Sequence, residues 1–457
     1  MKKILALLLA LAMLFTAVAC GAQGGQGDAT PTPDAEPTKE EIDLTEGGKW
    51  MNYKGANGDM NLRLPAYEFK SNTIRILNHY EIEQPDAGHF SALRDVYCLK
   101  YESVVVDNND KQRKLVSMVM GGDAPDVMWG SFMPALVTKG YIDAWNNYID
   151  FSIGLWTGLE SSLKNFEMNG NYYFIESQGA RHDNIIWVNK DLFEQLGAKT
   201  PMEYYEEGNW TWETLRECAL ATTLDEDGDG TAEIYGLAID EPNAFVFTTG
   251  VDFVTYNSDG TATNNILSAN VSRAVNFFVS LYADGVVNEE SDSRETFAAG
   301  NIAMYLGPLW YRASFTDMIF SDRVTVVPWP RDAQADKYYV KEEFGNIILS
   351  KDAPNPQGAA AYMCAKRYDV LNTDEAIYYD DETRKENLWE SNAIADLIEE
   401  YMFQEDRYPV SITWAAFEVS EYWGDIWFFT RLGEPWSSTA ERLAPLVDEK
   451  IDKILEG

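Results

Sequence analysis

The apolar positions of this chain fall into short runs that alternate with amphipathic stretches. Residues 73–77, 103–107 and 124–129 are short apolar runs that predict strands. Residues 110–120 carry apolar side chains at helical spacing, and a Gly-Gly pair follows them as a stop signal. Strands and helices in this alternation are typical of an open α/β sheet, in which ligands bind beyond the carboxyl ends of the strands.

The same alternation continues through the second half of the chain. Strands are predicted at residues 184–189, 302–306, 324–327 and 346–349, and helices at residues 190–196, 210–222 and 271–284. Beyond Gly358 the pattern is mostly helical, with helices predicted at about 358–369, 386–403 and 438–455. The predicted fold class is therefore α/β with a helical C-terminal portion.

The first residues predict an export signal and no folded element. Lys2 and Lys3 precede an apolar run over residues 4–18, which is shorter than the ~20 residues of a membrane span. The run ends in Ala-Val-Ala-Cys-Gly, which resembles the lipobox of bacterial lipoproteins. This resemblance implies cleavage before Cys20 and attachment of lipid to its thiol. An ordinary signal peptide followed by a chance cysteine is the alternative.

Cleavage at that point makes residues 1–19 the signal peptide and leaves residues 20–60 as a lipid-anchored tether. Residues 21–49 are rich in Gly, Pro, Thr and acidic residues, which cannot pack a core, so we expect a flexible segment. The expected location is the extracellular face of the bacterial cell membrane. The lipid on Cys20 would be the only contact with that membrane.

Charge and cysteine content narrow the classes of function and the means of stabilisation. The 457 residues include 74 Asp and Glu against 36 Lys and Arg, which gives a formal net charge of −38. This charge argues against a general nucleic-acid binder, because phosphate contacts need clustered Lys and Arg. Besides Cys20, the chain has only Cys98, Cys218 and Cys364. We expect these three to be buried as small hydrophobic residues or to form at most one disulfide.

Seven segments, in order, resemble the extracellular solute-binding proteins of ABC importers, in the branch that contains the maltose-binding protein. They are residues 121–127, 169–173, 188–193, 210–215, 297–305, 307–310 and 326–330. The Gly-Pro-Leu-Trp sequence that ends at Trp310 is the most specific, because in related sugar binders a Trp after Gly-Pro stacks on the ligand. An extra Leu309 separates Pro308 from Trp310 here, which is a departure from the family pattern.

The resemblance implies a two-lobed fold like that of periplasmic binding proteins of type II, with a hinge and an inter-lobe cleft. The first lobe is expected to hold residues 72–179 and 340–365, and the second lobe residues 180–339 and 366–457. The expected partners are a carbohydrate and the permease subunits of an ABC transporter. We expect a monomer.

Candidate ligand-binding residues cluster where predicted strands end. A sugar presents hydroxyl groups and apolar faces, so a receptor needs aromatic plates together with amide or carboxylate groups. The aromatic candidates are Trp310, Trp129, Trp187 and Trp329, and the polar candidates are His79, Glu81, Ser131, Arg181, Asp183 and Asn184. A late aromatic cluster adds Trp414, Glu418 and Tyr422. Core packing is the alternative for each ring, and an ion pair with Asp183 is the alternative for Arg181.

An acidic segment forms a separate candidate site. Oxygen-bearing side chains alternate along it, at Asp225, Asp227, Asp229, Thr231 and Glu233. With Gly230 at the sixth position, this pattern resembles an EF-hand calcium loop. The twelfth position is Gly236, where the motif requires Glu, so the EF-hand is incomplete. A structural Ca²⁺ and a solvated turn are both compatible with the pattern, and the expected function requires no cofactor.

The leading hypothesis is a lipid-anchored receptor that closes on an oligosaccharide and delivers it to a permease. One alternative is an extracellular carbohydrate-active hydrolase, which needs two positioned carboxylates. The other is a binding or sensor protein for a non-sugar solute such as a peptide. No family motif marks a catalytic carboxylate pair, so we predict that the protein is not an enzyme.

Overall fold

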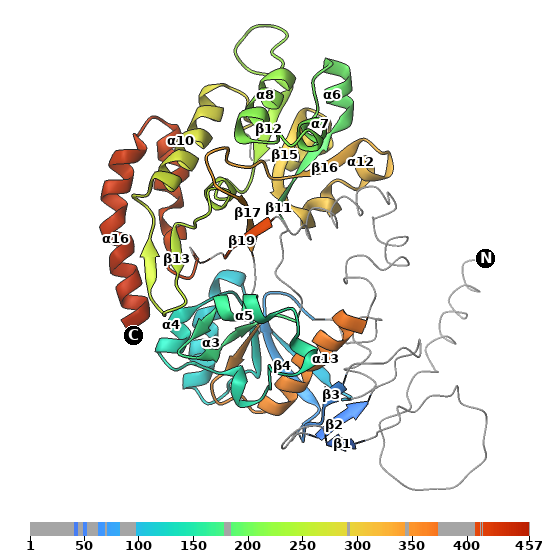
Figure 1. Ribbon diagram of the computed structural model, residues 1–457, viewed down its shortest axis with the longest axis vertical. Coiled ribbons are helices and arrows are strands. Elements are labelled where there is room, and N and C mark those ends of the chain that lie inside the picture. Colours follow the sequence, from blue (N-terminus) through green and yellow to red (C-terminus); the bar gives the residue numbers. More distant parts are fainter. Residues whose placement is uncertain are drawn as a thin grey trace, which may run out of the picture.

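The computed structural model consists of two α/β lobes, with a long C-terminal helix along one side of them (Figure 1). It describes residues 41–43, 49–52, 63–68, 71–82, 97–177, 184–289, 293–342, 347–372, 407–411, 413 and 415–456. No helix in these ranges is long and apolar enough to cross a membrane. The predicted signal peptide, Cys20 and the helix predicted at 386–403 lie outside the described residues.

The first lobe is built on a six-stranded sheet. Its strand order is β10-β18-β6-β4-β5, and β7 also pairs with β18. The strands are β4 (Thr73–Asn78), β5 (Lys100–Val105), β6 (Val127–Trp129), β7 (Ile142–Asp143), β10 (Phe174–Ile175) and β18 (Ile347–Ser350). The helices and helical turns are η2 (Asn108–Asp110), α3 (Lys111–Met120), α4 (Pro134–Thr138), η3 (Trp145–Asn147), η4 (Gly154–Trp156), α5 (Glu160–Asn165) and α13 (Pro356–Asn372).

The second lobe is built on a four-stranded sheet in the order β12-β15-β11-β16. The strands are β11 (Asn184–Asn189), β12 (Tyr235–Ile239), β15 (Ile302–Pro308) and β16 (Val324–Pro328). The helices are α6 (Lys190–Leu196), α7 (Pro201–Glu206), α8 (Trp212–Thr222), α9 (Ala244–Phe247), α10 (Ala269–Ala283), α11 (Ser293–Ala298), η5 (Leu309–Ser314) and α12 (Thr316–Phe320).

Smaller elements complete the described part of the chain. An antiparallel sheet joins β1 (Glu41–Asp43), β2 (Lys49–Asn52) and β3 (Arg63–Pro65), and two hairpins pair β8 (Glu167–Met168) with β9 (Asn171–Tyr172) and β13 (Val254–Tyr256) with β14 (Ala262–Asn264). Strand β17 (Tyr338–Glu342) runs parallel to β19 (Arg407–Ser411) between the two lobes (Figure 1). The chain ends with η6 (Val419–Tyr422), η7 (Gly424–Phe429) and α16 (Trp436–Glu456).

Local chemistry accounts for where the second-lobe helices begin and end. The side chain of Thr211 accepts a hydrogen bond from the backbone N–H of Thr214 and caps α8, as predicted. Asn189 caps α6 in the same way, and Gly197 ends that helix in the left-handed conformation.

Gly236 at the start of β12 has a packing role, because a Cβ there would lie 2.2 Å from the carbonyl oxygen of Ala219.

Helix α16 packs on both lobes. Its backbone carbonyl at Ile454 accepts a hydrogen bond of 3.0 Å from the Thr138 hydroxyl on α4 in the first lobe. The Trp436 indole at its other end donates to Ser272 on α10 in the second lobe, at 3.1 Å. The Asn264 amide on β14 donates to the carbonyl of Ala444 in the middle of the helix. The C-terminal helix therefore links the two lobes along one side.

The observed elements follow the sequence pattern closely, with two differences. Strand β5 ends at Val105, earlier than predicted. Helix α13 continues to Asn372 and stays with the first lobe, so the lobe boundary predicted after residue 365 falls inside this helix. Its Arg367 side chain donates hydrogen bonds to the carbonyls of Leu155 and Thr157 in that lobe.

The cysteines meet the prediction in part. Cys218 and Cys364 are buried, as expected for small hydrophobic side chains. Cys98 is exposed, so the expectation of burial was wrong for this residue. Among the described residues, none of these three cysteines forms a disulfide.

Candidate functional site

The candidate site is built from one end of each of the two sheets. We call the strand ends on that side the edge of the lobe. In the first lobe, Trp129 at the carboxyl end of β6 pairs with Ile347 at the start of β18. In the second lobe, Asn184 at the start of β11 pairs with Pro308 at the end of β15. Ser177 is the last described residue before β11, and Ile347 is the first described residue after β17. The two edges, with Trp129 on one and the residues after Pro308 on the other, form the candidate site.

On the first-lobe edge, aromatic rings contact one another in a row. The half-buried ring of Trp129 meets Tyr80 edge to face, with ring centroids 5.9 Å apart. Tyr80 in turn meets His79 at 4.8 Å, also edge to face. Tyr80 is 44% exposed, so this row of rings reaches solvent. Such a surface offers apolar ring faces beside polar groups, which suits the faces and hydroxyls of a sugar.

A lysine lies against the aromatic rings of this edge. The ammonium of Lys366 on α13 lies 4.6 Å from the Trp129 ring centroid and 5.4 Å from that of Tyr362. Lys366 is buried, and burial also raises the pKa of Tyr362 well above its usual value. This cation–π contact stabilises the Trp129 indole in its present position.

The other first-lobe candidates lie at the same edge. His79 and Glu81 are exposed directly after β4, and Ser131 is half-buried two residues beyond Trp129. Sequence reasoning missed Tyr80, although its neighbours His79 and Glu81 were chosen. It also missed Lys366, and no local signal could have found it, because only the folding of α13 onto the sheet brings it to Trp129.

On the second-lobe edge, η5 follows directly from β15 and carries Trp310. The backbone of Trp310 lies in this turn, while its side chain is outside the described part of the structure. The neighbouring Tyr311 hydroxyl donates a hydrogen bond to Asp240, which follows β12. The Arg294 guanidinium lies 4.7 Å from the Tyr311 ring centroid. These contacts hold η5 against the sheet edge and so set the position of the Trp310 backbone.

The carboxyl group of Asp240 is partly desolvated at this edge, although the residue as a whole is exposed. Desolvation raises its pKa above the usual aspartate value, Glu241 next to it raises the pKa further, and Arg294 lowers it. Glu241 itself pairs with Lys341 of β17 at 3.2 Å. The second-lobe edge is thus tied to the strand that lies between the lobes. Asn184 begins β11 at the same edge, with its side chain outside the described part.

Two of the tryptophans predicted as ligand plates belong to the core. Trp187 is fully buried, lies 5.3 Å from the Phe315 ring and donates to the carbonyl of Pro308. Trp329 is 4% exposed and packs edge to face on Phe245 at 5.1 Å. Both rings are covered because they lie in or directly after strands whose two faces carry other elements. We therefore correct the prediction for these two residues.

The late aromatic cluster packs against the C-terminal helix. Glu418 forms an ion pair of 2.5 Å with Lys450 on α16, and the same ammonium lies 5.9 Å from the ring of Tyr422. Among the described residues, no contact joins these two side chains to Trp129. Trp414, Arg181 and Asp183 lie outside the described residues.

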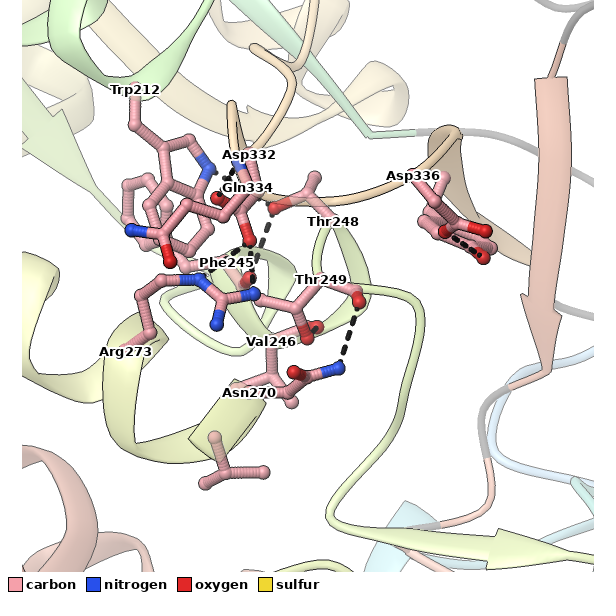
Figure 2. A network of polar contacts seen from close by, with 12 residues as sticks. Trp212, Phe245, Val246, Thr248, Thr249, Asn270, Arg273, Asp332, Gln334 and Asp336 are labelled. Carbon is pink, nitrogen blue, oxygen red and sulfur yellow. Dashed lines mark hydrogen bonds and ion pairs between the residues drawn. The ribbon is translucent and has the colours of Figure 1, made fainter. Parts of the chain in front are cut away.

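A buried polar network in the second lobe includes Arg273 and Asp332 (Figure 2). The Arg273 guanidinium on α10 donates to Asp332 from Nε at 2.8 Å and from Nη2 at 2.5 Å. Asp332 is 2% exposed and follows Trp329 by three residues. Nearby, the Trp212 indole donates to the Thr248 hydroxyl at 3.1 Å. The network anchors the segment that leads from β16 to β17.

The acidic loop forms the one group of described side chains arranged to share a cation. One carboxylate oxygen from each of Asp225, Asp227 and Asp229 lies within 4.8 Å of the others, and all three side chains are exposed. Asp225 accepts hydrogen bonds from the backbone N–H groups of Gly228 and Gly230.

The other members of the predicted loop take part in its turns. The backbone N–H of Thr231 donates to Asp229, and Glu233 accepts from the backbone N–H of Glu226. The same carboxylates therefore close the loop through backbone hydrogen bonds. Gly236, at the twelfth position of the pattern, has the packing role described above and offers no side-chain ligand.

Comparison with known proteins identifies the family. Residues 98–368, more than half of the chain, match the model of the bacterial extracellular solute-binding proteins. The chain belongs to this family. No curated protein sequence shows significant similarity to this solute-binding protein.

Solved structures share the two-lobed fold. An ABC substrate-binding protein of Listeria monocytogenes in complex with cycloalternan matches with a TM-score of 0.59 at 16% identity, over 83% of this chain and 98% of its own. The maltose/maltodextrin-binding domain MalE of Bdellovibrio bacteriovorus, bound to maltotriose, matches with a TM-score of 0.55 at 16% identity, over 83% and 99% of the two chains. The sugar-binding protein MalE of Xanthomonas citri matches with a TM-score of 0.59 at 13% identity, over 83% and 98%. The resemblance confirms the predicted fold class.

Proposed function

We propose that this solute-binding protein captures a carbohydrate between its two lobes and delivers it to the permease subunits of an ABC transporter. The observation that carries the proposal is the row of rings at the first-lobe edge, where Trp129 meets the exposed Tyr80. An indole plate beside polar side chains is the surface that binds the apolar face of a sugar ring. The cycloalternan and maltotriose in the complexes of similar fold support the same class of ligand.

Binding between two lobes gives a simple means of signalling to a permease. A sugar that touches Trp129 on one lobe and the turn η5 on the other gains its second set of contacts only in the closed state. It therefore favours closure by the free energy of those extra contacts. A permease that recognises the closed form then receives loaded protein. This role requires no catalysis, and we propose that the protein is not an enzyme.

The experiment for this proposal is a binding panel. Isothermal titration calorimetry on the mature protein with maltotriose, mannotriose, cellotriose and the corresponding disaccharides should find at least one ligand with a Kd in the micromolar range or below. A matched panel of tri- and tetrapeptides serves as the control. Binding of a peptide and of no sugar would contradict the carbohydrate assignment.

We further propose that lipid on Cys20 holds the mature protein at the outer face of the membrane. The small residues before Cys20 and the polar segment after it support this location. Metabolic labelling with an alkyne analogue of palmitate should mark the wild type and spare Cys20→Ser. Equal labelling of the two proteins would contradict lipidation at this residue.

A further inference from the structure

A buried lysine without a counter-charge lies close enough to His79, at the proposed sugar plate, for its charge to act on that residue. Lys111 is the first residue of α3 and is only 8% exposed. Among the described residues, no hydrogen bond or ion pair reaches its ammonium. Burial lowers its pKa, since desolvation disfavours the charged form. A buried lysine is normally paired, so this one requires an explanation.

A second polar group without a partner lies at the same edge. Asn78, the last residue of β4, is fully buried, and neither the oxygen nor the nitrogen of its side-chain amide has a hydrogen-bond partner. Buried amides are almost always satisfied in native proteins. The backbone carbonyl of Asn78 does accept a bond from Val106, so only the side chain lacks a partner.

The sheet register brings Asn78 close to Trp129. Leu77 on β4 lies opposite Met128 on β6, and Asn78 and Trp129 are the next residues along the two strands. On its other side, Asn78 lies opposite Val105, at the end of the strand that leads to α3. His79 follows Asn78 and begins the row of rings that ends at Trp129. Asn78 thus adjoins the proposed sugar plate, and the charge of Lys111 acts on His79 in the same row of rings.

The acidic residues of the neighbouring turn are engaged elsewhere. Asp107 accepts a hydrogen bond from the backbone N–H of Asn109, and Asp110 pairs with Arg113. The pKa of His79 is lowered by desolvation and by the positive charge of Lys111, while Asp107 raises it. Of these two charges, Lys111 has the larger effect on the pKa of His79, in a protein whose overall charge is strongly negative.

We infer that the carboxyl edge of β4 is a subsite for an acidic group of the bound sugar, a carboxylate or a phosphate, held by Lys111 and the Asn78 amide. An anionic oxygen would give the ammonium its missing counter-charge and would accept from the Asn78 Nδ2–H. His79 would border the opening of the subsite. This inference rests on the proposed function and narrows its substrate class from sugars in general to acidic sugars.

The test compares matched neutral and acidic sugars. Calorimetry is run with maltose and maltobionate, glucose and glucuronate, and glucose and glucose 6-phosphate, which separate carboxylate from phosphate. In at least one pair the acidic member should bind the wild type about 10- to 100-fold tighter, the range that a charge-assisted hydrogen bond supplies. Lys111→Met should remove this preference, and Lys111→Arg should keep part of it.

Control variants keep the test decisive. Lys114→Met removes an exposed charge from the same helix and should leave the preference unchanged. Lys111→Met replaces a buried ammonium by an apolar chain of similar length, so it should fold, which a thermal melt checks. Asn78→Asp supplies an internal counter-charge and should abolish the preference independently.

Two results overturn the inference alone. In the first, the neutral and acidic members of every pair bind equally. In the second, the preference for the acidic sugar survives Lys111→Met. Both results leave the proposed sugar binding in place. If no sugar of either kind binds, the proposed function fails together with this subsite.

Discussion

Arg273 on α10 and Asp332 after β16 form a buried ion pair in which both guanidinium contacts, at 2.5 and 2.8 Å, reach the same carboxylate oxygen. The other oxygen of Asp332 accepts from the backbone N–H of Gln334. The pair fixes the chain on its way from the second-lobe sheet to the strand between the lobes (Figure 2).

Removing one partner of this pair should destabilise the fold strongly. Arg273→Leu leaves the 2% exposed carboxylate of Asp332 without its cation, which we expect to lower the free energy of unfolding by about 3–5 kcal/mol. Replacing both partners by Leu should recover much of this loss. Urea unfolding measures both. The control is Lys453→Leu, which breaks an exposed pair with Glu449 and should cost less than about 1 kcal/mol. Equal effects of the two single substitutions would contradict this account.

Gly236 should tolerate no side chain. The Cβ of Gly236→Ala would lie 2.2 Å from the carbonyl oxygen of Ala219 on α8, so helix and strand would have to separate. We expect a loss of about 2–3 kcal/mol in thermal or urea unfolding. Gly154→Ala, where a Cβ meets nothing within 4 Å, is the matched control and should change stability by less than about 1 kcal/mol. A neutral Gly236→Ala would mean that β12 and α8 lie further apart.

The raised pKa of Asp240 predicts that stability depends on pH. Its pKa is raised above the usual 3.8, mainly by desolvation of the carboxyl group, so the folded state binds the proton more tightly than the unfolded state. The contribution of this group to stability is present below pH 3.8 and is lost as pH rises through its raised pKa. The stability of the wild type relative to Asp240→Asn should therefore decline from acidic to neutral pH. Urea unfolding of both proteins at several pH values checks this, and a pH-independent difference would contradict it.

Removal of metal distinguishes the two interpretations of the acidic loop. If Asp225, Asp227 and Asp229 hold Ca²⁺, a chelator should lower the Tm, because an ion bound only to the folded state stabilises it by mass action. Asp227→Ala with Asp229→Ala should then abolish the difference between chelated and calcium-loaded protein. A solvated turn predicts identical melts of the wild type with and without chelator.

Much of the fold could be predicted because its strands and caps are local signals. The run at 184–189 is apolar enough to be a central strand, and Thr211 precedes its helix as an N-cap must. The site was harder to predict, because Trp129 and Trp187 have similar local sequences. Only packing distinguishes them. Trp187 is completely buried, whereas Trp129, at the end of its strand, is half-buried.

Residues brought in from distant segments escaped sequence reasoning altogether. Lys366 reaches Trp129 from a helix more than two hundred residues later in the chain. The Tyr311–Asp240 contact that holds η5 joins the ends of two neighbouring strands that are far apart in sequence. The late return of the chain to the first lobe was predicted from the family resemblance, but the end of α13 was not, because its apolar residues have no clear periodicity.

The measurement that tests the central claim most directly is the affinity of Trp129→Ala for the sugar that binds the wild type best. Loss of one stacking contact should cost about 1–3 kcal/mol, by analogy with stacking of bases on aromatic side chains, and so weaken binding roughly ten- to a hundred-fold. Trp310→Ala should act similarly from the other lobe. Trp187→Ala, at a core ring, should instead destabilise the fold by about 3–5 kcal/mol. Calorimetry alongside thermal melts separates the two effects. An unchanged Kd in a folded Trp129→Ala protein would contradict the account.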